Sequence, residues 1–369
     1  MKSRSRHLPF PAWAALSLPL LALSACTGTE ETAPDVRIAL LTDGGRTLGY
    51  VTSTLGNTAP SALTGTQNLA SANGRGVDLA PLNTGRNLAL TLTDRIEQRD
   101  VNLASAAAFE ALPFTPCLTQ TAQNIGRDRL FTFSECNGVQ QVALYRSDRT
   151  LIWWATLPTK PLPIPSSDTP PIRIAVVGDS GVVARPALTG GSEVMRIVPR
   201  TSGDPLQDRV AVVSDPIPTL SIRDLAPYGN DIYAATDTGV RPLLPTGVPD
   251  ATNTPSSVTA FGTGRVDRLW YGLAGSKGLL AAWRDNFSSG NSTEPLRIWD
   301  VASAKPAVNT VAIAGLRDLA FDLNGQMYTL SANSLNRYDA LLSLQQGYWY
   351  GTTLNSSLQD AIALTVLVP

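Results

Sequence analysis

Histidine is almost absent from this sequence, since His7 is the only one. A chain without histidine beyond that position cannot use Ser-His-Asp or Cys-His catalysis. It also cannot bind zinc, copper or iron through imidazole. Glutamate is scarce as well, and no pair of acidic residues stands out as a catalytic acid and base. We therefore expect no catalytic residues, no metal site and no cofactor.

Lysine is also rare, and after residue 25 it occurs only as Lys160, Lys277 and Lys305. Arginine carries nearly all of the positive charge, and the formal net charge of the whole chain is −1. A nucleic-acid-binding protein would show a basic patch or stripe. The sequence therefore gives no reason to expect a nucleic-acid partner.

Long apolar runs are missing except at the start of the chain. Lys2, Arg4 and Arg6 precede an apolar stretch from Leu8 to Leu23, which ends in Leu23-Ser24-Ala25-Cys26. A basic region, a short apolar region and small residues form the three parts of a secretory signal. The stretch is shorter than the roughly 20 residues of a transmembrane helix and is interrupted by prolines.

The residues Leu23-Ser24-Ala25-Cys26 resemble the lipobox of bacterial lipoproteins. In that family the chain is cut before the cysteine, whose thiol and new amino group are then acylated. The resemblance implies a signal peptide over 1–25, lipid attachment at Cys26, a polar tether over 26–35 and a folded domain over 36–369. The alternative is a signal that is cleaved without lipidation. The expected location is the bacterial cell envelope, at the outer membrane or cell surface, with the protein held to the membrane by its lipid.

Two further cysteines, Cys117 and Cys136, lie in the body of the chain. In an oxidising compartment such a pair is normally bridged. We predict a disulfide between them. Two separate buried thiols remain the alternative, since sequence does not fix their distance.

The body of the chain is a succession of short strands and tight turns. Phe131–Cys136 and Val139–Tyr145 flank Asn137-Gly138, which is the strongest short-range sign of a β-hairpin. Gly178-Asp179-Ser180-Gly181 resembles a serine-protease nucleophile segment, but without a histidine base we predict a turn between two strands. Only the alanine-rich segment Leu103–Leu112 has a helical pattern, and we expect a short helix there.

A weak repeat runs through the chain. Asp-Leu-Ala occurs three times, Asp-Arg-Leu-aromatic occurs twice, and a faint copy lies near the end; the marker residues are Asp78, Asp128, Asp224, Asp267, Asp318 and Asp360. Their mean spacing is about 47 residues if one degenerate copy near Arg173 is counted, and units of 40–50 residues with four strands are typical of β-propellers. The sequence predicts an all-β, seven-bladed propeller. We expect the hairpin of Val36–Ser53 and the C-terminal segment Leu358–Val368 to share one blade and so close the ring.

One segment, Leu296-Arg297-Ile298-Trp299-Asp300, resembles a WD40 repeat, although the Gly-His element of that family is missing. The stretch Asp318–Gly325 resembles the looser repeats of NHL and quinoprotein-type propellers. These likenesses imply a propeller architecture, which hosts many functions. Each marker aspartate is interpreted as a structural residue of a blade turn, and a ring of carboxylates that holds a cation is the alternative.

We predict a lipid-anchored propeller that acts as a binding or scaffolding module for an envelope protein or a glycan. The alternative is a carboxylate-dependent, glycan-active enzyme or a cation-dependent propeller enzyme. A pair of buried carboxylates facing each other in the central channel would favour the enzyme. Aromatic side chains exposed on the rim would favour carbohydrate or protein binding.

Overall fold

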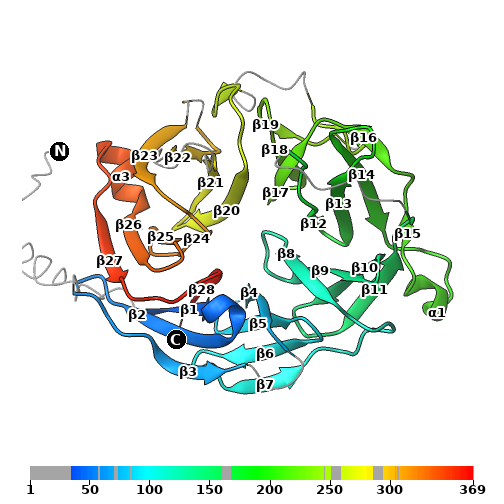
Figure 1. The fold of residues 1–369 in the computed structure, drawn as a ribbon, viewed down its shortest axis with the longest axis horizontal. Helices are drawn as coiled ribbons and strands as arrows, with labels where there is room; N and C mark the ends of the chain where they lie inside the picture. The colour runs from blue at the N-terminus through cyan, green and yellow to red at the C-terminus, as the bar shows by residue number, and fades with distance from the viewer. Residues whose placement is uncertain are drawn as a thin grey trace, which may run out of the picture. The chain divides into compact units, whose positions relative to one another are not determined.

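The computed structural model describes residues 35–56, 59–69, 74–83, 85–159, 168–244, 246–250, 259–285, 294–303, 305 and 307–368. In this part of the chain, seven small antiparallel sheets form a ring around a central channel (Figure 1). Each sheet is one blade of a propeller, and the predicted seven-bladed fold is confirmed. Residues 1–34, with Cys26 and the predicted signal, lie outside the described residues.

Each blade is built from an inner strand at the channel outward. The inner strands are β4 (Gly76–Leu82), β8 (Leu118–Gln123), β12 (Arg173–Val177), β17 (Ile222–Tyr228), β20 (Arg268–Ala274), β24 (Asp318–Phe321) and β28 (Ala363–Leu367). The second strands are, in the same order, β5 (Asn87–Leu92), β9 (Arg129–Cys136), β13 (Ser180–Pro186), β18 (Asp231–Thr236), β21 (Lys277–Trp283), β25 (Gln326–Leu330) and β1 (Val36–Thr42).

The third and outer strands complete the blades. The third strands are β6 (Ile96–Asp100), β10 (Val139–Arg146), β14 (Ser192–Val198), β19 (Gly239–Pro242), β22 (Glu294–Asp300), β26 (Leu335–Asp339) and β2 (Thr47–Ser53). The outer strands are β7 (Ser105–Ala108), β11 (Leu151–Thr156), β15 (Val212–Val213) with β16 (Ile217–Thr219), β23 (Val308–Ile313), β27 (Gly351–Asn355) and β3 (Thr64–Asn68). The β17–β19 blade has three described strands.

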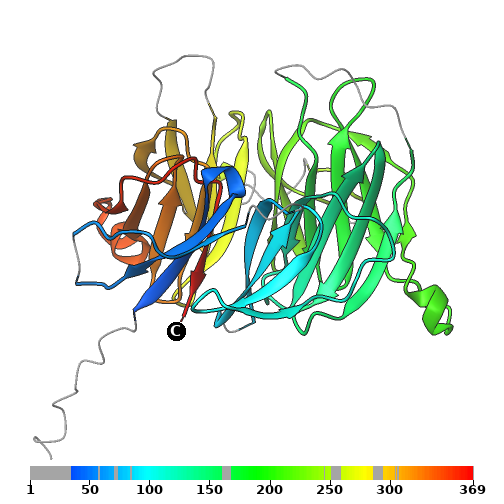
Figure 2. The ribbon, with the colours of Figure 1, turned by 60° about the horizontal axis from the view of Figure 1, so that its bottom comes forward.

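The two ends of the folded domain meet in one blade, as predicted. The C-terminal strand β28 pairs with β1 in antiparallel register, from Arg37 opposite Leu367 to Leu41 opposite Ala363. The order of this closing blade is β28, β1, β2, β3. Its inner strand therefore comes from the end of the chain and its other three strands from the start (Figure 2). Backbone hydrogen bonds across this junction leave no unmatched end sheet in the ring.

The predicted turns are present, but the predicted helix is wrong. Asn137 and Gly138 join β9 to β10 with φ angles of 52° and 80°, as a type I′ turn requires. Gly178 and Asp179 join β12 to β13. The segment Leu103–Leu112 contains β7, which pairs with β6, instead of a helix. Pairing within the blade overrides the local helix propensity of its alanines.

Helices are short and lie between strands. Those with described bounds are the 3₁₀ turn η1 (Asp43–Gly45), α1 (Pro205–Asp208) and α3 (Ala340–Gln346). No helix in the described ranges is both apolar enough and long enough for a bilayer crossing.

The core lies between neighbouring blades. Phe131 and Trp153 of one blade pack with Val183 and Met195 of the next, and all four are fully buried. Arginine side chains add polar links between blades. Arg337 on β26 donates to Ser53 Oγ at 2.9 Å and to the carbonyl of Thr54 at 2.7 Å, in the closing blade. The planar guanidinium has five donors, which suits it to such multiple contacts better than lysine.

Candidate functional site

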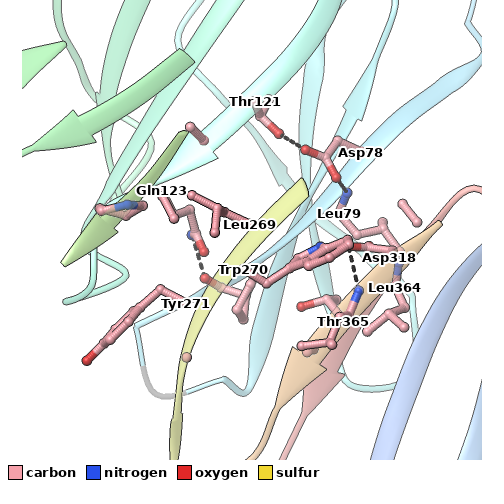
Figure 3. A pocket seen from close by; sticks show the side chains of 18 of the residues that line it. Asp78, Leu79, Thr121, Gln123, Leu269, Trp270, Tyr271, Asp318, Leu364 and Thr365 are labelled. Atoms are coloured by element: carbon pink, nitrogen blue, oxygen red, sulfur yellow. Dashed lines mark hydrogen bonds between the residues drawn. The ribbon is translucent and has the colours of Figure 1, made fainter. Parts of the chain in front are cut away.

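A cavity of about 470 Å³ occupies the central channel. It is lined by residues from all seven inner strands. Figure 3 shows that Asp78 and Asp318 face this space from neighbouring sides, with the indole of Trp270 beside Asp318. A cavity of this size matches the range of small-molecule sites, about 300–1,000 Å³. The channel is therefore the candidate site.

One residue from each inner strand lies at an equivalent position near the start of that strand. In β4, β8 and β17 the position directly follows a register shift, where Asp78, Gln120 and Asp224 face Thr91, Phe133 and Ala235 of the second strand. The first residue of each of the other four inner strands completes the set. We call it the channel ring: Asp78, Gln120, Arg173, Asp224, Arg268, Asp318 and Ala363.

The three ring aspartates make the same pair of contacts. In each, Oδ1 accepts a hydrogen bond from the next backbone N–H, at 2.8 Å from Leu79, 3.0 Å from Leu225 and 2.8 Å from Leu319. In each, Oδ2 accepts from the inner strand of the following blade. The donors are Thr121 Oγ1 at 2.5 Å, the Leu269 nitrogen at 3.0 Å and the Leu364 nitrogen at 2.8 Å, for Asp78, Asp224 and Asp318 respectively. These carboxylates link blades at the channel wall.

Asp224 sits between two arginines of the ring. Its Oδ1 is 3.1 Å from Arg173 Nε, and its Oδ2 is 3.3 Å from Arg268 Nε. Two guanidinium groups thus share one carboxylate on this side of the channel. The Arg268 guanidinium also lies 4.9 Å from the centre of the Trp270 ring. Among the described residues, its two terminal nitrogens have no hydrogen-bond partner.

The opposite side of the ring is acidic. Asp78 and Asp318 flank β28, whose ring residue is the small Ala363. Burial, together with the negative charge of Asp318, raises the pKa of Asp78 to about 7, against smaller opposing effects from Thr121, Leu79 and Arg268. Burial also raises the pKa of Asp318, although the Leu364 N–H, Arg268 and the Trp270 indole oppose this. Near neutral pH this side can therefore both donate and accept hydrogen bonds.

The marker aspartates fall into two groups. Asp78, Asp224 and Asp318 occupy the channel ring. Asp128 precedes β9 at the turn from β8, where it accepts a hydrogen bond from the Asn124 side chain. Asp267 lies before β20 and accepts from Arg265 Nε and the Asp285 nitrogen. Asp360 lies before β28 and pairs with Arg317 at 2.5 Å. The six residues do not form one ring.

Of the other polar members of the ring, the repeat locates Arg173 only as a degenerate copy, and it does not predict Gln120 or Arg268 as ring residues. A detectable pattern connects them to the aspartates, because Arg173-Ile174-Ala175 and Arg268-Leu269-Trp270 begin inner strands as Asp-Leu-Ala does. The string Asp-Arg-Leu-aromatic does not mark one place in the blade. It begins the second strand β9 in one copy and the inner strand β20 in the other.

Cys117 and Cys136 form the predicted disulfide, with their Cα atoms 5.3 Å apart. It joins the residue before β8 to the last residue of β9. Within the described chain no three His, Cys, Asp or Glu side chains gather to form a metal-binding cluster.

No family model and no curated protein match this sequence. Its fold is similar to that of a Bacteroides fragilis NCTC 9343 protein described as a candidate 6-phosphogluconolactonase, with a TM-score of 0.57 and 12% identity over 91% of this chain and 99% of that one. A Bacteroides uniformis ATCC 8492 protein with the same description gives 0.55 and 14% over 91% and 100%. A functionally unknown protein from Desulfotomaculum acetoxidans DSM 771 gives 0.58 and 12% over 90% and 99%. These likenesses establish the propeller fold.

Proposed function

We propose that this protein is a lipid-anchored propeller of the bacterial cell envelope that binds a short, carboxylate-bearing glycan fragment in its central channel. The observation that carries the proposal is the unequal division of charge around the channel ring. Arg173 and Arg268 share Asp224 on one side, while Asp78 and Asp318 line the other. Such a ring offers hydrogen-bond donors to an anionic group and both donors and acceptors to hydroxyl groups.

Arg268 is the expected contact for the ligand carboxylate. Arg268 is one of the residues that line the cavity, and a guanidinium can donate two parallel hydrogen bonds to a carboxylate. The Trp270 indole beside it offers an apolar surface, but its N–H is already used by Asp318 Oδ1 at 3.0 Å. The ligand would therefore be oriented by its charge at Arg268 and by its hydroxyl groups near Asp78.

Calorimetric titration with two disaccharides tests this proposal. The probes are N-acetylglucosaminyl-N-acetylmuramic acid, which carries a carboxylate, and chitobiose, which does not. We expect the acidic disaccharide to bind more tightly and Arg268→Gln to weaken it about tenfold or more, as the loss of a charge-assisted hydrogen bond does. Arg146→Gln is the matched control, because Arg146 is exposed on β10, away from the channel. Equal or absent binding of both probes would overturn the proposal.

The location is tested separately. If Cys26 is acylated, the full-length protein should fractionate with membranes and carry a lipid-modified N-terminal peptide in mass spectrometry. Cys26→Ala should release it to the soluble fraction of the exported proteins. A wild-type protein whose N-terminal peptide lacks lipid would contradict the lipoprotein assignment and leave the channel proposal intact.

The acidic pair supports a second candidate, cleavage of a glycosidic bond. A raised pKa such as that of Asp78 suits a general acid, and two carboxyl groups are the minimum for this reaction. Against it, both oxygens of Asp318 already accept N–H groups of the protein. Release of new reducing ends from a glycan, abolished by Asp78→Asn, would favour the enzyme over the binding module. Unchanged glycan would exclude it.

A further inference from the structure

A second surface lies at the outer edge of a blade, away from the channel. Its residue types are those of a carbohydrate-binding surface. It follows α3 on the rim of the β24–β27 blade, where β27 is the outer strand (Figure 1). Tyr348 and Tyr350 are 64% and 81% exposed, while Trp349 between them is buried. Exposure thus alternates along these three residues, and the two tyrosines lie on the outer side of the segment.

The local structure holds this segment in place. Asp339 caps the start of α3 by accepting a hydrogen bond from the Leu342 nitrogen at 2.9 Å, and Gly347 ends the helix with a left-handed φ of 77°. The chain then leads into β27, and Trp349 packs on Tyr338 with ring centroids 6.5 Å apart. The end of α3 and the packing of Trp349 therefore hold in place the segment that carries the two exposed tyrosines.

The two exposed rings lie nearly parallel. Their centroids are 6.4 Å apart and their planes differ by 27°. Two large exposed aromatic side chains in contact with each other are unusual on a surface without a partner. The π face of an aromatic ring is electronegative, and the C–H groups on the face of a sugar ring are complementary to it.

The surrounding sequence is uncharged. No Asp, Glu, Lys or Arg occurs from Ala340 to Gln359, whereas Gln, Ser, Thr and Asn are frequent. Gln345, Gln346 and Thr353 are exposed in this segment. A protein interface tends to combine aromatic residues with arginine. A segment without charged side chains, with amide and hydroxyl groups beside aromatic rings, instead complements an uncharged polysaccharide, although charged residues such as Lys277 and Asp300 line a cavity on another side of α3.

We propose that Tyr348 and Tyr350 form a binding platform for an uncharged glycan chain. The platform is distinct from the channel ring and does not depend on the channel ligand. In a membrane-anchored protein it would hold the propeller against a polymer of its surroundings. The neutral amides and hydroxyls would bond the sugar hydroxyls, and the two rings would contact successive sugar units.

The test uses calorimetric titration of the full folded protein with cellohexaose, chitohexaose and maltohexaose. We expect at least one to bind, and the double variant Tyr348→Ala/Tyr350→Ala to weaken that binding by on the order of tenfold. The variant Tyr348→Phe/Tyr350→Phe should retain most of it, because the ring faces remain. Leu206→Ala is the matched control, since Leu206 is equally exposed, on α1 in another part of the ring.

Channel variants separate this proposal from the proposed function. Arg268→Gln should leave hexasaccharide binding at the rim unchanged, and the tyrosine variants should leave binding of the acidic disaccharide unchanged. Failure of all three hexasaccharides to bind would overturn the platform. So would capture of a single envelope protein, in place of glycan, by a photo-crosslinking Tyr350→p-benzoylphenylalanine variant in cells.

Discussion

The carboxylate of Asp318 is bonded to the backbone of Leu364, with 2.8 Å between Asp318 Oδ2 and the Leu364 nitrogen. The two residues lie 46 positions apart in sequence and on the inner strands of neighbouring blades. Leu364 belongs to β28, the strand that closes the ring. A single side chain therefore ties the closing strand to the blade before it.

Asp318→Asn should destabilise the fold. Asp318 accepts three N–H groups with two oxygens, from Leu319, Trp270 and Leu364. An amide has one oxygen, so at least one buried donor loses its acceptor and faces an NH₂ group instead. Leaving such a group unpaired costs about 1–3 kcal/mol. Urea unfolding followed by fluorescence measures this loss, with the exposed Asp231→Asn as control; equal stability of Asp318→Asn and wild type would contradict the role.

Asp78→Asn should change how the stability of the fold depends on pH. The raised pKa of Asp78 means that the folded protein favours the protonated carboxyl near pH 6. The folded pKa is about 7 and the ordinary value is 3.8. Between these values the unfolded chain has released a proton that the folded chain retains. The contribution of Asp78 to stability is therefore full below pH 4, falls as the pH rises toward 7, and is level above it.

An asparagine mimics the protonated acid and cannot titrate. Its oxygen can accept from the Leu79 nitrogen while its NH₂ donates to Thr121 Oγ1. Relative to wild type, Asp78→Asn should thus become progressively more stable from pH 4 to pH 7. Urea unfolding of both proteins at four pH values across this window measures the difference. Parallel stability curves would show that Asp78 does not titrate there.

The fold was predictable because its repeat has a physical origin. Asp224-Leu225-Ala226 and Asp318-Leu319-Ala320 recur since both strands need a buried leucine and a carboxylate that reaches the next blade. The Asn137-Gly138 turn was predictable for a similar local reason, the positive φ of both residues.

The channel ring was only partly predictable because its members share a position and not a residue type. Arg173 and Arg268 replace aspartate at equivalent positions, and their partner is Asp224 of the blade between them. Such pairing depends on contacts between strands that are about 45–50 residues apart, which local patterns do not report. For the same reason, Asp128 and Asp267 share a motif without sharing a place in the blade.

Truncation of the chain after Ala361 should abolish cooperative folding. It removes β28, which pairs with β1 over five residues and supplies Leu364 and Leu367 to two core clusters. The ring would then lack one inner strand and expose the edge of β1. The point variant Leu367→Ala is milder and should cost about 2–4 kcal/mol, since Leu367 is fully buried. Calorimetry should show no transition for the truncated chain and a shifted one for Leu367→Ala.

The disulfide should stabilise one blade without shaping the channel. Cys117 and Cys136 lie 19 positions apart in sequence and close a loop that contains β8 and most of β9. In the chain-entropy description a loop of this size contributes about 3 kcal/mol. The double variant Cys117→Ala/Cys136→Ala should therefore unfold at lower urea concentration, and a reducing agent should lower the stability of the wild type to a similar level while leaving the variant unchanged.

Because both cysteines lie outside the channel lining, the variant should bind the acidic disaccharide as wild type does. A loss of binding at full folding would instead mean that the bridge positions Gln120 or Thr121 on β8.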